Sequence, residues 1–170
     1  VSGAIGDSQS GGFFPAELKF AGFDGIVIRG RSPKPVYLSI LHGEPRLHDA
    51  HHLLGKPTGE VDALLRQEVG EPKAEVLQHG PAAARGVLFS SLVSMANRNN
   101  GRTGMGLVMA SKELKAIVVR GKGPLPVADP PALAALSKQG ARDVHENPDM
   151  EGLFQHGTAG VVLPQNMMGT

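Results

Sequence analysis

The apolar runs of this chain are short, and a glycine or proline ends most of them. The 170 residues include 23 glycines and 13 prolines. Both residue types are poorly tolerated inside helices and strands, so the chain must fold as short elements joined by many turns. Strands are predicted where the runs are rich in β-branched residues, at Gly25–Arg29, Pro35–Leu41, Ala74–Leu77, Val87–Val93 and Leu114–Val119. No run reaches the roughly eighteen apolar residues of a transmembrane helix, so membrane insertion is not expected.

Local patterns place further elements and divide the chain. The turn at residues 42–45 is expected to fold residues 46–48 back onto the strand at 35–41, which predicts a hairpin. An amphipathic helix ending at Gly70 is predicted from one apolar stripe: Val61, Leu64, Leu65 and Val69. Helical spacing begins after Asp129, which is expected to cap a helix. The pattern predicts an α+β fold, with a β-rich domain over residues 1–126 and the start of a helical domain over residues 127–170.

Composition excludes several kinds of function. The chain has no cysteine, so these residues cannot form a disulfide, a thiolate zinc site, a cysteine nucleophile or a cysteine-held iron–sulfur cluster. The formal net charge is +1, which gives no electrostatic basis for binding nucleic acid. The chain begins with Val1 and has no signal-peptide pattern, so it is expected to be part of a longer protein.

Two glycine-containing loops carry the most informative chemistry. The first is Gln9-Ser10-Gly11-Gly12, and the second runs from Arg98 to Gly106 and includes Arg102. Exposed main-chain N–H groups and two arginines four residues apart are suited to holding phosphate or pyrophosphate. Side-chain or main-chain oxygens of Gln9 and Asn99 could also bind a hard cation such as Mg²⁺. The alternative is that both loops are structural turns, and neither matches the dinucleotide-binding or P-loop pattern.

Other polar groups give weaker indications. Three histidines lie within the five residues His48–His52 and could bind a divalent ion, although the segment also fits the exit of a hairpin. Asp7, Glu17 and Asp24 could act as acid and base, but nothing in the sequence distinguishes them from solvated carboxylates. No catalytic residue is therefore assigned.

Three long motifs resemble those of the tungsten-dependent aldehyde ferredoxin oxidoreductases. They are Gly11–Ile28 (GGFFPAELKFAGFDGIVI), Asp49–Lys56 (DAHHLLGK) and Gly101–Ile117 (GRTGMGLVMASKELKAI). The resemblance implies an N-terminal domain in which two β-sheets form a cradle for a bis-pterin cofactor that carries tungsten or molybdenum. It also implies that the cysteines holding a [4Fe–4S] cluster, and the acid and base residues near the metal, lie outside these residues.

The same resemblance assigns residues to the cofactor. It places Gln9, Gly11 and Gly12 in a first pterin-phosphate loop, and a second loop receives Arg98, Asn99, Gly101 and Arg102. Gln9 and Asn99 correspond to the positions whose oxygens bind a Mg²⁺ that joins the pterin phosphates. This sequence departs from the family where Gln9 replaces Asn, Asn99 replaces Ala, and Thr103 and Ala110 replace glycines.

The implied whole protein is a cytoplasmic, oligomeric enzyme that oxidises an aldehyde to a carboxylic acid. Electrons would pass through the [4Fe–4S] cluster to ferredoxin or an electron-transfer subunit, and no nucleic-acid partner is expected. One alternative is a relative that reduces an acid or aromatic acyl-CoA thioester in a larger electron-transfer complex. The other is a cofactor-free β-domain that binds an anion or serves as a scaffold.

Overall fold

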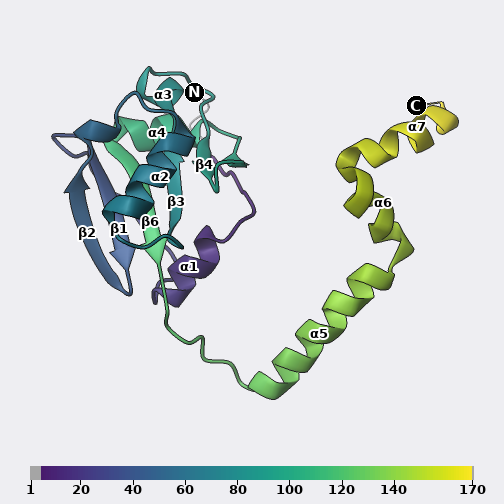
Figure 1. The fold of residues 1–170 in the computed structure, drawn as a ribbon. Helices are drawn as coiled ribbons and strands as arrows, with labels where there is room; N and C mark the ends of the chain where they lie inside the picture. The colour runs from purple at the N-terminus through teal and green to yellow at the C-terminus, as the bar shows by residue number, and fades with distance from the viewer. Residues whose placement is uncertain (1–4, 170) are drawn as a thin grey trace. The chain divides into compact units, whose positions relative to one another are not determined.

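The computed structural model describes residues 5–169, which divide into two units (Figure 1). The first unit extends to Leu125 and contains all the strands of the described residues. The second begins at Pro126 and is helical. The α+β class predicted from the sequence is confirmed.

The first unit is built on one mixed sheet of six strands in the order β2-β1-β6-β3-β4-β5 (Figure 1). Its central pair, β1 and β6, is parallel, and all other neighbours are antiparallel. The described residues thus form one sheet, whereas the family resemblance implied a cradle of two. The strands are β1 (Val36–Leu41), β2 (Glu44–Asp49), β3 (Glu75–His79), β4 (Leu92–Ser94), β5 (Arg98–Asn100) and β6 (Leu114–Arg120).

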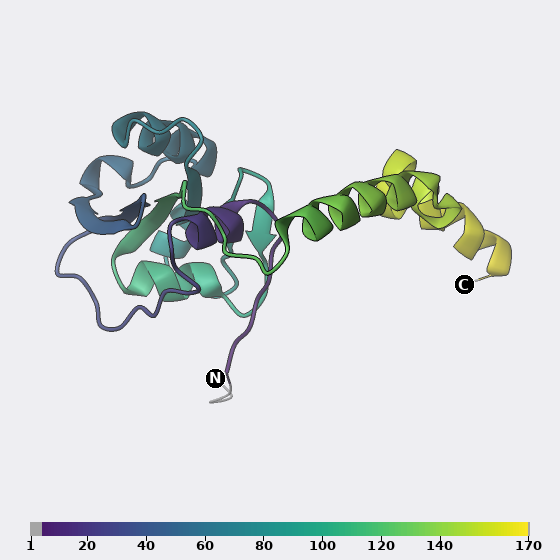
Figure 2. The same ribbon diagram turned by 90° about the horizontal axis from the view of Figure 1, so that it is seen from below.

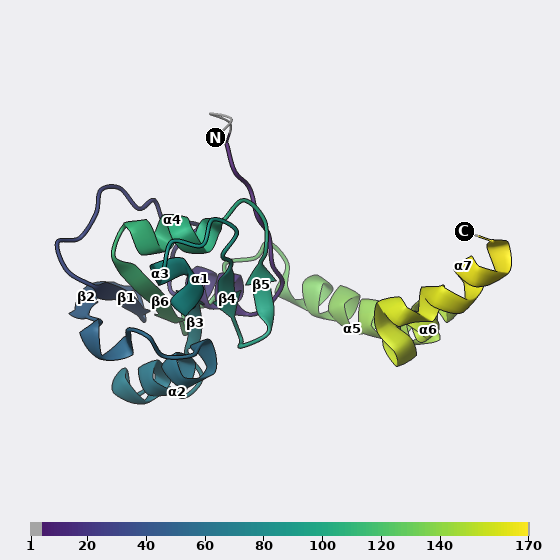
Figure 3. The same cartoon turned by 90° about the horizontal axis from the view of Figure 1, so that it is seen from above.

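Helices cover both faces of this sheet. Helix α2 (Thr58–Glu68) follows the short 3₁₀ helix η1 (His51–Leu53), and both contribute to a core that includes the β-strand residues Tyr37 and Val118. On the opposite face, α1 (Phe14–Phe20) and α4 (Met105–Ser111) pack over a second core with Ile117 and Val119 (Figure 3). The four-residue α3 (Pro81–Ala84) follows β3. Alternate residues of β6 therefore face two apolar layers.

The predicted hairpin, the helix ending near Gly70 and three of the five predicted strands are confirmed. The buried strand predicted at residues 25–29 is wrong. These residues pair with no strand of the described part, and Val27 is 83% exposed. Figure 2 shows this segment running around the α4 side of the sheet, where Lys112 Nζ donates to the Gly30 carbonyl at 3.1 Å. The segment is thus held at its end by α4 contacts and not by a strand ladder.

The strand predicted at residues 87–93 is also largely wrong, because only Leu92–Ser94 is a strand. A tight turn forms first, in which Ser90 N donates to the Val87 carbonyl. The Leu88 and Ser91 carbonyls then lie against Gly104 and Gly106, too close for any Cβ at either glycine. Residues 98–100, expected in a turn, form β5 instead.

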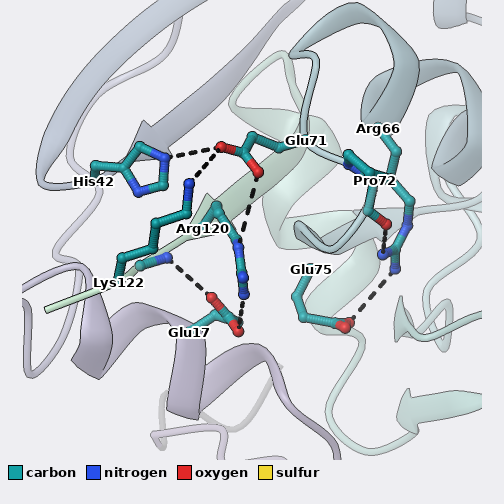
Figure 4. Close-up of polar contacts among 9 residues, drawn as sticks. Glu17, His42, Arg66, Glu71, Pro72, Glu75, Arg120 and Lys122 are labelled. Atoms are coloured by element: carbon teal, nitrogen blue, oxygen red, sulfur yellow. Dashed lines mark hydrogen bonds and ion pairs between the residues drawn. The ribbon is translucent and has the colours of Figure 1, made fainter. Parts of the chain in front are cut away.

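A partly buried ion-pair network fixes α1 to the end of β6 (Figure 4). Arg120 donates to Glu17 at 2.5 Å, and the second oxygen of Glu17 accepts from Gly121 N at 2.9 Å. Glu71 extends the network, because it accepts from Lys122 and bonds the His42 ring. The His42 and Lys122 contacts lower the pKa of the Glu71 carboxyl. Glu17 is therefore a structural carboxylate.

Strand β6 contains a β-bulge at its start. Val36 lies opposite Leu114, whereas the next residue, Tyr37, lies opposite Ala116. Lys115 is thus an extra residue in the ladder. A bulge redirects the side chain of the inserted residue. Lys115 therefore does not follow the pattern in which successive side chains of β6 point alternately to the two cores.

The second unit consists of α5 (Pro130–Glu146), α6 (Pro148–His156), the 3₁₀ helix η2 (Gly157–Val161) and α7 (Val162–Met168). Asp129 caps α5, because its carboxylate accepts from Ala132 N at 2.9 Å, as predicted. Over residues 5–169, no helix combines the length and apolarity needed to cross a membrane.

The contact between Gly121 and α1 predicts a sharp stability loss for Gly121→Ala. A Cβ at this buried position would lie 2.2 Å from Ala21 N and from the Phe20 carbonyl carbon, so the backbone must shift. We expect Gly121→Ala to lower the free energy of unfolding of the full-length protein by about 2–3 kcal/mol, measured by thermal melting. The control is Gly59→Ala in α2, where a Cβ meets nothing within 4 Å. Equal melting temperatures for both variants would contradict the packing described.

Candidate functional site

The two glycine-containing loops, far apart in sequence, lie side by side in the first unit. The Asn100 side chain joins them, because it accepts from Ser10 Oγ at 3.1 Å and donates to the Ser8 carbonyl at 2.8 Å. A third bond runs from Arg102 N to Ser8 Oγ at 3.1 Å. In Figure 3 the segment that leads into α1 runs past β4 and β5. The structure therefore brings the two predicted segments together.

Gly12 lies directly against the second segment. A Cβ at Gly12 would be 2.9 Å from Met95 Sδ and 3.6 Å from Arg98 Cγ, and its φ of +125° favours glycine. The next residue, Phe13, also has its N–H 3.4 Å from Met95 Sδ. Gly12 thus permits an approach between the loops that a side chain would block.

Arg98 and Arg102 lie on this shared surface with their charges uncompensated. Both residues are exposed. Neither forms an ion pair with a carboxylate among residues 5–169, whereas Arg66 and Arg120 each bind glutamate. Two guanidinium groups without a protein counter-ion form a site suited to a doubly charged oxyanion.

The glycines leave main-chain N–H groups accessible beside these arginines. Gly11 and Gly101 are exposed, and a Cβ at either position would meet no atom within 4 Å. Open space next to the backbone lets an anion approach the amide hydrogens closely. Exposed arginines beside accessible main-chain N–H groups are suited to phosphate groups that contact both loops.

Oxygen donors for a cation are also present at the predicted positions. Gln9 is exposed, and its Nε2 lies 3.4 Å from the Asp7 carboxylate. Its Oε1 accepts no hydrogen bond from the described residues. Asn99 is the central residue of the edge strand β5, opposite Val93. Asp7 adds a carboxylate next to Gln9 that the sequence pattern had not connected to the loops.

One of the positions that depart from the family, Thr103, has an unusual backbone conformation. Its φ is 61°, in the left-handed region that β-branched residues rarely adopt. The hydroxyl of Thr103 donates to the Arg102 carbonyl at 2.7 Å. A glycine, the residue that Thr103 replaces in the family, would adopt this conformation without strain.

The other candidates from the sequence are distributed among separate structural contacts. His51 Nδ1 pairs with Asp49, His52 Nε2 with Glu68, and His48 Nε2 with Ser39 Oγ. Hydrogen bonds from His51, above all from its main-chain N–H, lower the pKa of Asp49 to about 2. Within the described part of the chain, no three His, Cys, Asp or Glu residues gather as metal ligands, so the histidine-cluster hypothesis is wrong. Asp24 pairs with Lys19 at the surface.

Sequence reasoning found the charged and glycine residues of the loops but missed the residues that join them. Ser8, Ser10 and Asn100 carry no motif of their own, and their bonds span about ninety residues of sequence. The available signal was the polar composition around the glycines, which is typical of any turn. The hydrogen bonds of the folded structure reveal that these residues meet.

Comparison with known proteins gives a consistent result. The family model described as "Aldehyde ferredoxin oxidoreductase, N-terminal domain" matches residues 1–121. The tungsten-containing aldehyde ferredoxin oxidoreductase of Pyrococcus furiosus is 39% identical over 163 residues, and that of Thermococcus kodakarensis is 40% identical over 162. Each alignment covers 95% of this chain and 27% of the relative. This chain therefore spans about a quarter of the length of these relatives.

More distant relatives share the same region. The WOR-like subunit of the aliphatic sulfonate oxidoreductase of P. furiosus is 35% identical over 138 residues, which cover 74% of this chain and 22% of that subunit. A solved structure, the active-site complex BamBC of benzoyl-coenzyme A reductase with 1,5-dienoyl-CoA, matches with a TM-score of 0.78 and 37% identity. It covers 84% of this chain and 22% of the BamBC chain. The domain match and these identities show that the chain belongs to the aldehyde ferredoxin oxidoreductase family.

Proposed function

We propose that this chain is part of a tungsten-dependent aldehyde oxidoreductase and that its two loops hold the phosphate groups of the pterin cofactor. The observation that carries the proposal is the junction of the loops by Asn100 beside two arginines that form no ion pair within residues 5–169. Two relatives at 39–40% identity are named as tungsten-containing enzymes, which supports the choice of metal. Molybdenum is the alternative metal for the same pterin.

The chain's own residues would act by binding and orientation. Arg98 and Arg102 would neutralise phosphate charge through the paired N–H groups of each guanidinium. Gly11, Gly12 and Gly101 would offer main-chain N–H groups to the remaining phosphate oxygens. The bound tungsten–pterin cofactor would supply the two-electron chemistry by which an aldehyde and water become a carboxylic acid. Fixing the phosphates at both loops would orient the cofactor relative to the sheet.

A Mg²⁺ ion between the phosphates fits the oxygen donors on this surface. Gln9 Oε1 accepts no hydrogen bond within the described residues, and the Asn99 carbonyl lies on the edge strand. Mg²⁺ prefers hard oxygen ligands and usually retains waters together with phosphate oxygens. Few protein ligands are therefore needed.

The remaining parts of the enzyme would lie in the longer protein. This chain has no cysteine, so a [4Fe–4S] cluster and its electron transfer to ferredoxin or a partner subunit require residues elsewhere. We assign residues 1–126 to the pterin-binding domain and residues 127–170 to the start of the helical domain. The subunit and complex named among the relatives support a partner subunit in electron transfer.

A second candidate function follows from the match to BamBC. That complex is named as part of a benzoyl-coenzyme A reductase, so the alternative is that this chain belongs to an enzyme that reduces an aromatic acyl-CoA. Both candidates use the same phosphate-binding loops. Two measurements distinguish them. One compares the activity of the purified full-length protein on aldehydes with its activity on acyl-CoA thioesters, and the other identifies the subunits that copurify with it.

Replacing both arginines tests the phosphate-binding role. Charge-assisted hydrogen bonds contribute about 1.5–3 kcal/mol each, so we expect Arg98→Ala with Arg102→Ala to reduce cofactor occupancy at least about tenfold. Tungsten and pterin content per mole of anaerobically purified full-length protein are measured. Arg85→Ala is the control, because Arg85 is also exposed and has no ion pair among the described residues. Unchanged metal and pterin content in the double variant would favour the scaffold function.

Replacing Gln9 tests the cation site separately. We expect Gln9→Ala to lower the Mg²⁺ content per cofactor, whereas Gln9→Asn retains it because an amide oxygen remains. Magnesium and tungsten are measured together by elemental analysis, with Gln67→Ala on the exposed surface of α2 as the control. If Gln9→Ala, Gln9→Asn and Gln67→Ala all retain Mg²⁺, Gln9 is not a ligand of the ion.

A further inference from the structure

A lysine is buried within the central strand, away from the two loops. Lys115 lies in β6 between Leu114 and Ala116, and it is 2% exposed. Lysine is among the residue types least often buried without a charged partner. Its presence in an otherwise apolar strand therefore calls for a specific reason.

Backbone geometry directs this lysine out of the sheet. Lys115 is the inserted residue of the β-bulge, and Glu113, two residues earlier and just before β6, has a φ of 58°, in the left-handed region. A non-glycine residue in this conformation is strained. Bulges and such residues are found where a side chain is aimed at a site. One departure from regular backbone geometry thus lies at Lys115, and a second lies two residues before it.

The amine is incompletely satisfied in its buried position. Lys115 Nζ donates one hydrogen bond, at 2.5 Å, to the carbonyl of His79 at the end of β3. An ammonium has three hydrogens to donate, and no carboxylate pairs with it among residues 5–169. Burial lowers the pKa of Lys115 to about 8, so the amine still carries its charge at pH 7. A buried cation without a counter-ion is costly.

A small cavity of about 210 Å³ lies next to this amine. Its walls combine apolar side chains with three polar residues. The lining includes Pro35, Leu54, Ala84 and Ala110, together with His79, Glu113 and Lys115. The Glu113 carboxylate is already paired with Arg31 at 2.6 Å, and His79 Nδ1 bonds the Gly80 carbonyl. Lys115 is therefore the cation of the cavity that pairs with no carboxylate of the described residues.

We propose that this cavity binds a small carboxylate, which accepts the remaining hydrogen bonds of Lys115. A carboxylate supplies both the missing charge and the acceptor oxygens. The apolar walls suit a short alkyl chain, and the volume lies below the 300–1,000 Å³ typical of sites for larger ligands. The lining residues include none of those assigned to the phosphates, so this site is independent of the proposed cofactor site.

Propionate binding to the full-length protein tests the proposal. Titration calorimetry is performed at pH 7, with sodium chloride at equal ionic strength as the reference. We expect saturable binding of propionate to the wild type, weakened at least about tenfold by Lys115→Met, which removes the charge at similar volume. Lys112→Met is the matched control, because Lys112 Nζ also donates to a carbonyl but lies outside the cavity lining.

Further variants separate this site from the proposed active site. Propionate could also bind there as a reaction product, but that binding would not depend on Lys115. We therefore expect the Lys115-dependent binding to persist in the Arg98→Ala, Arg102→Ala protein. If Lys115→Met does not fold, Lys115→Gln provides the uncharged variant. Equal propionate affinity in the wild type and the uncharged variant, or no propionate binding to the wild type, would overturn the proposal.

Discussion

The pairing of β6 with both β1 and β3 is the constraint on which the first unit depends. Each face of β6 contributes to a different apolar core, so the strand fixes α2 on one side and α1 with α4 on the other. The β1–β2 hairpin extends the sheet in one direction, and β3, β4 and β5 extend it in the other. The end of β6 is fixed in turn, because Arg120 and Gly121 both bond the Glu17 carboxylate of α1. The sheet therefore determines where each loop can lie.

The candidate phosphate site is a consequence of that sheet. Strand β5 presents Arg98 and Asn100 at the sheet edge, and Asn100 holds the loop before α1 against it. Glycine at position 12 allows the loop to contact Met95 and Arg98 closely. The result is a surface on which exposed glycines of both loops lie near two exposed arginines. Such a surface is suited to binding an anion, and we assign no catalytic residue to this chain.

Local sequence patterns predicted the elements whose formation depends on neighbouring residues. The hairpin of β1 and β2 and the amphipathic helix α2 belong to this group. The strands expected at 25–29 and 87–93 failed for a long-range reason: an apolar run becomes a strand only where a partner strand lies alongside it. The same limit applies to the site. Its charged and glycine residues were recognisable from their types and from the family resemblance, but the bonds made by Asn100 were not, because they join distant segments.

The central claim is that the loops at residues 9–12 and 98–102 hold the phosphates of a metal–pterin cofactor. The most direct test is a crystal or cryo-electron microscopy structure of the full-length protein purified anaerobically with its cofactor. We predict phosphate oxygens within hydrogen-bonding distance of the Arg98 and Arg102 guanidinium groups and of main-chain N–H groups at Gly11 or Gly12. A cofactor bound with its phosphates on other residues, and with both arginines in solvent, would contradict the account.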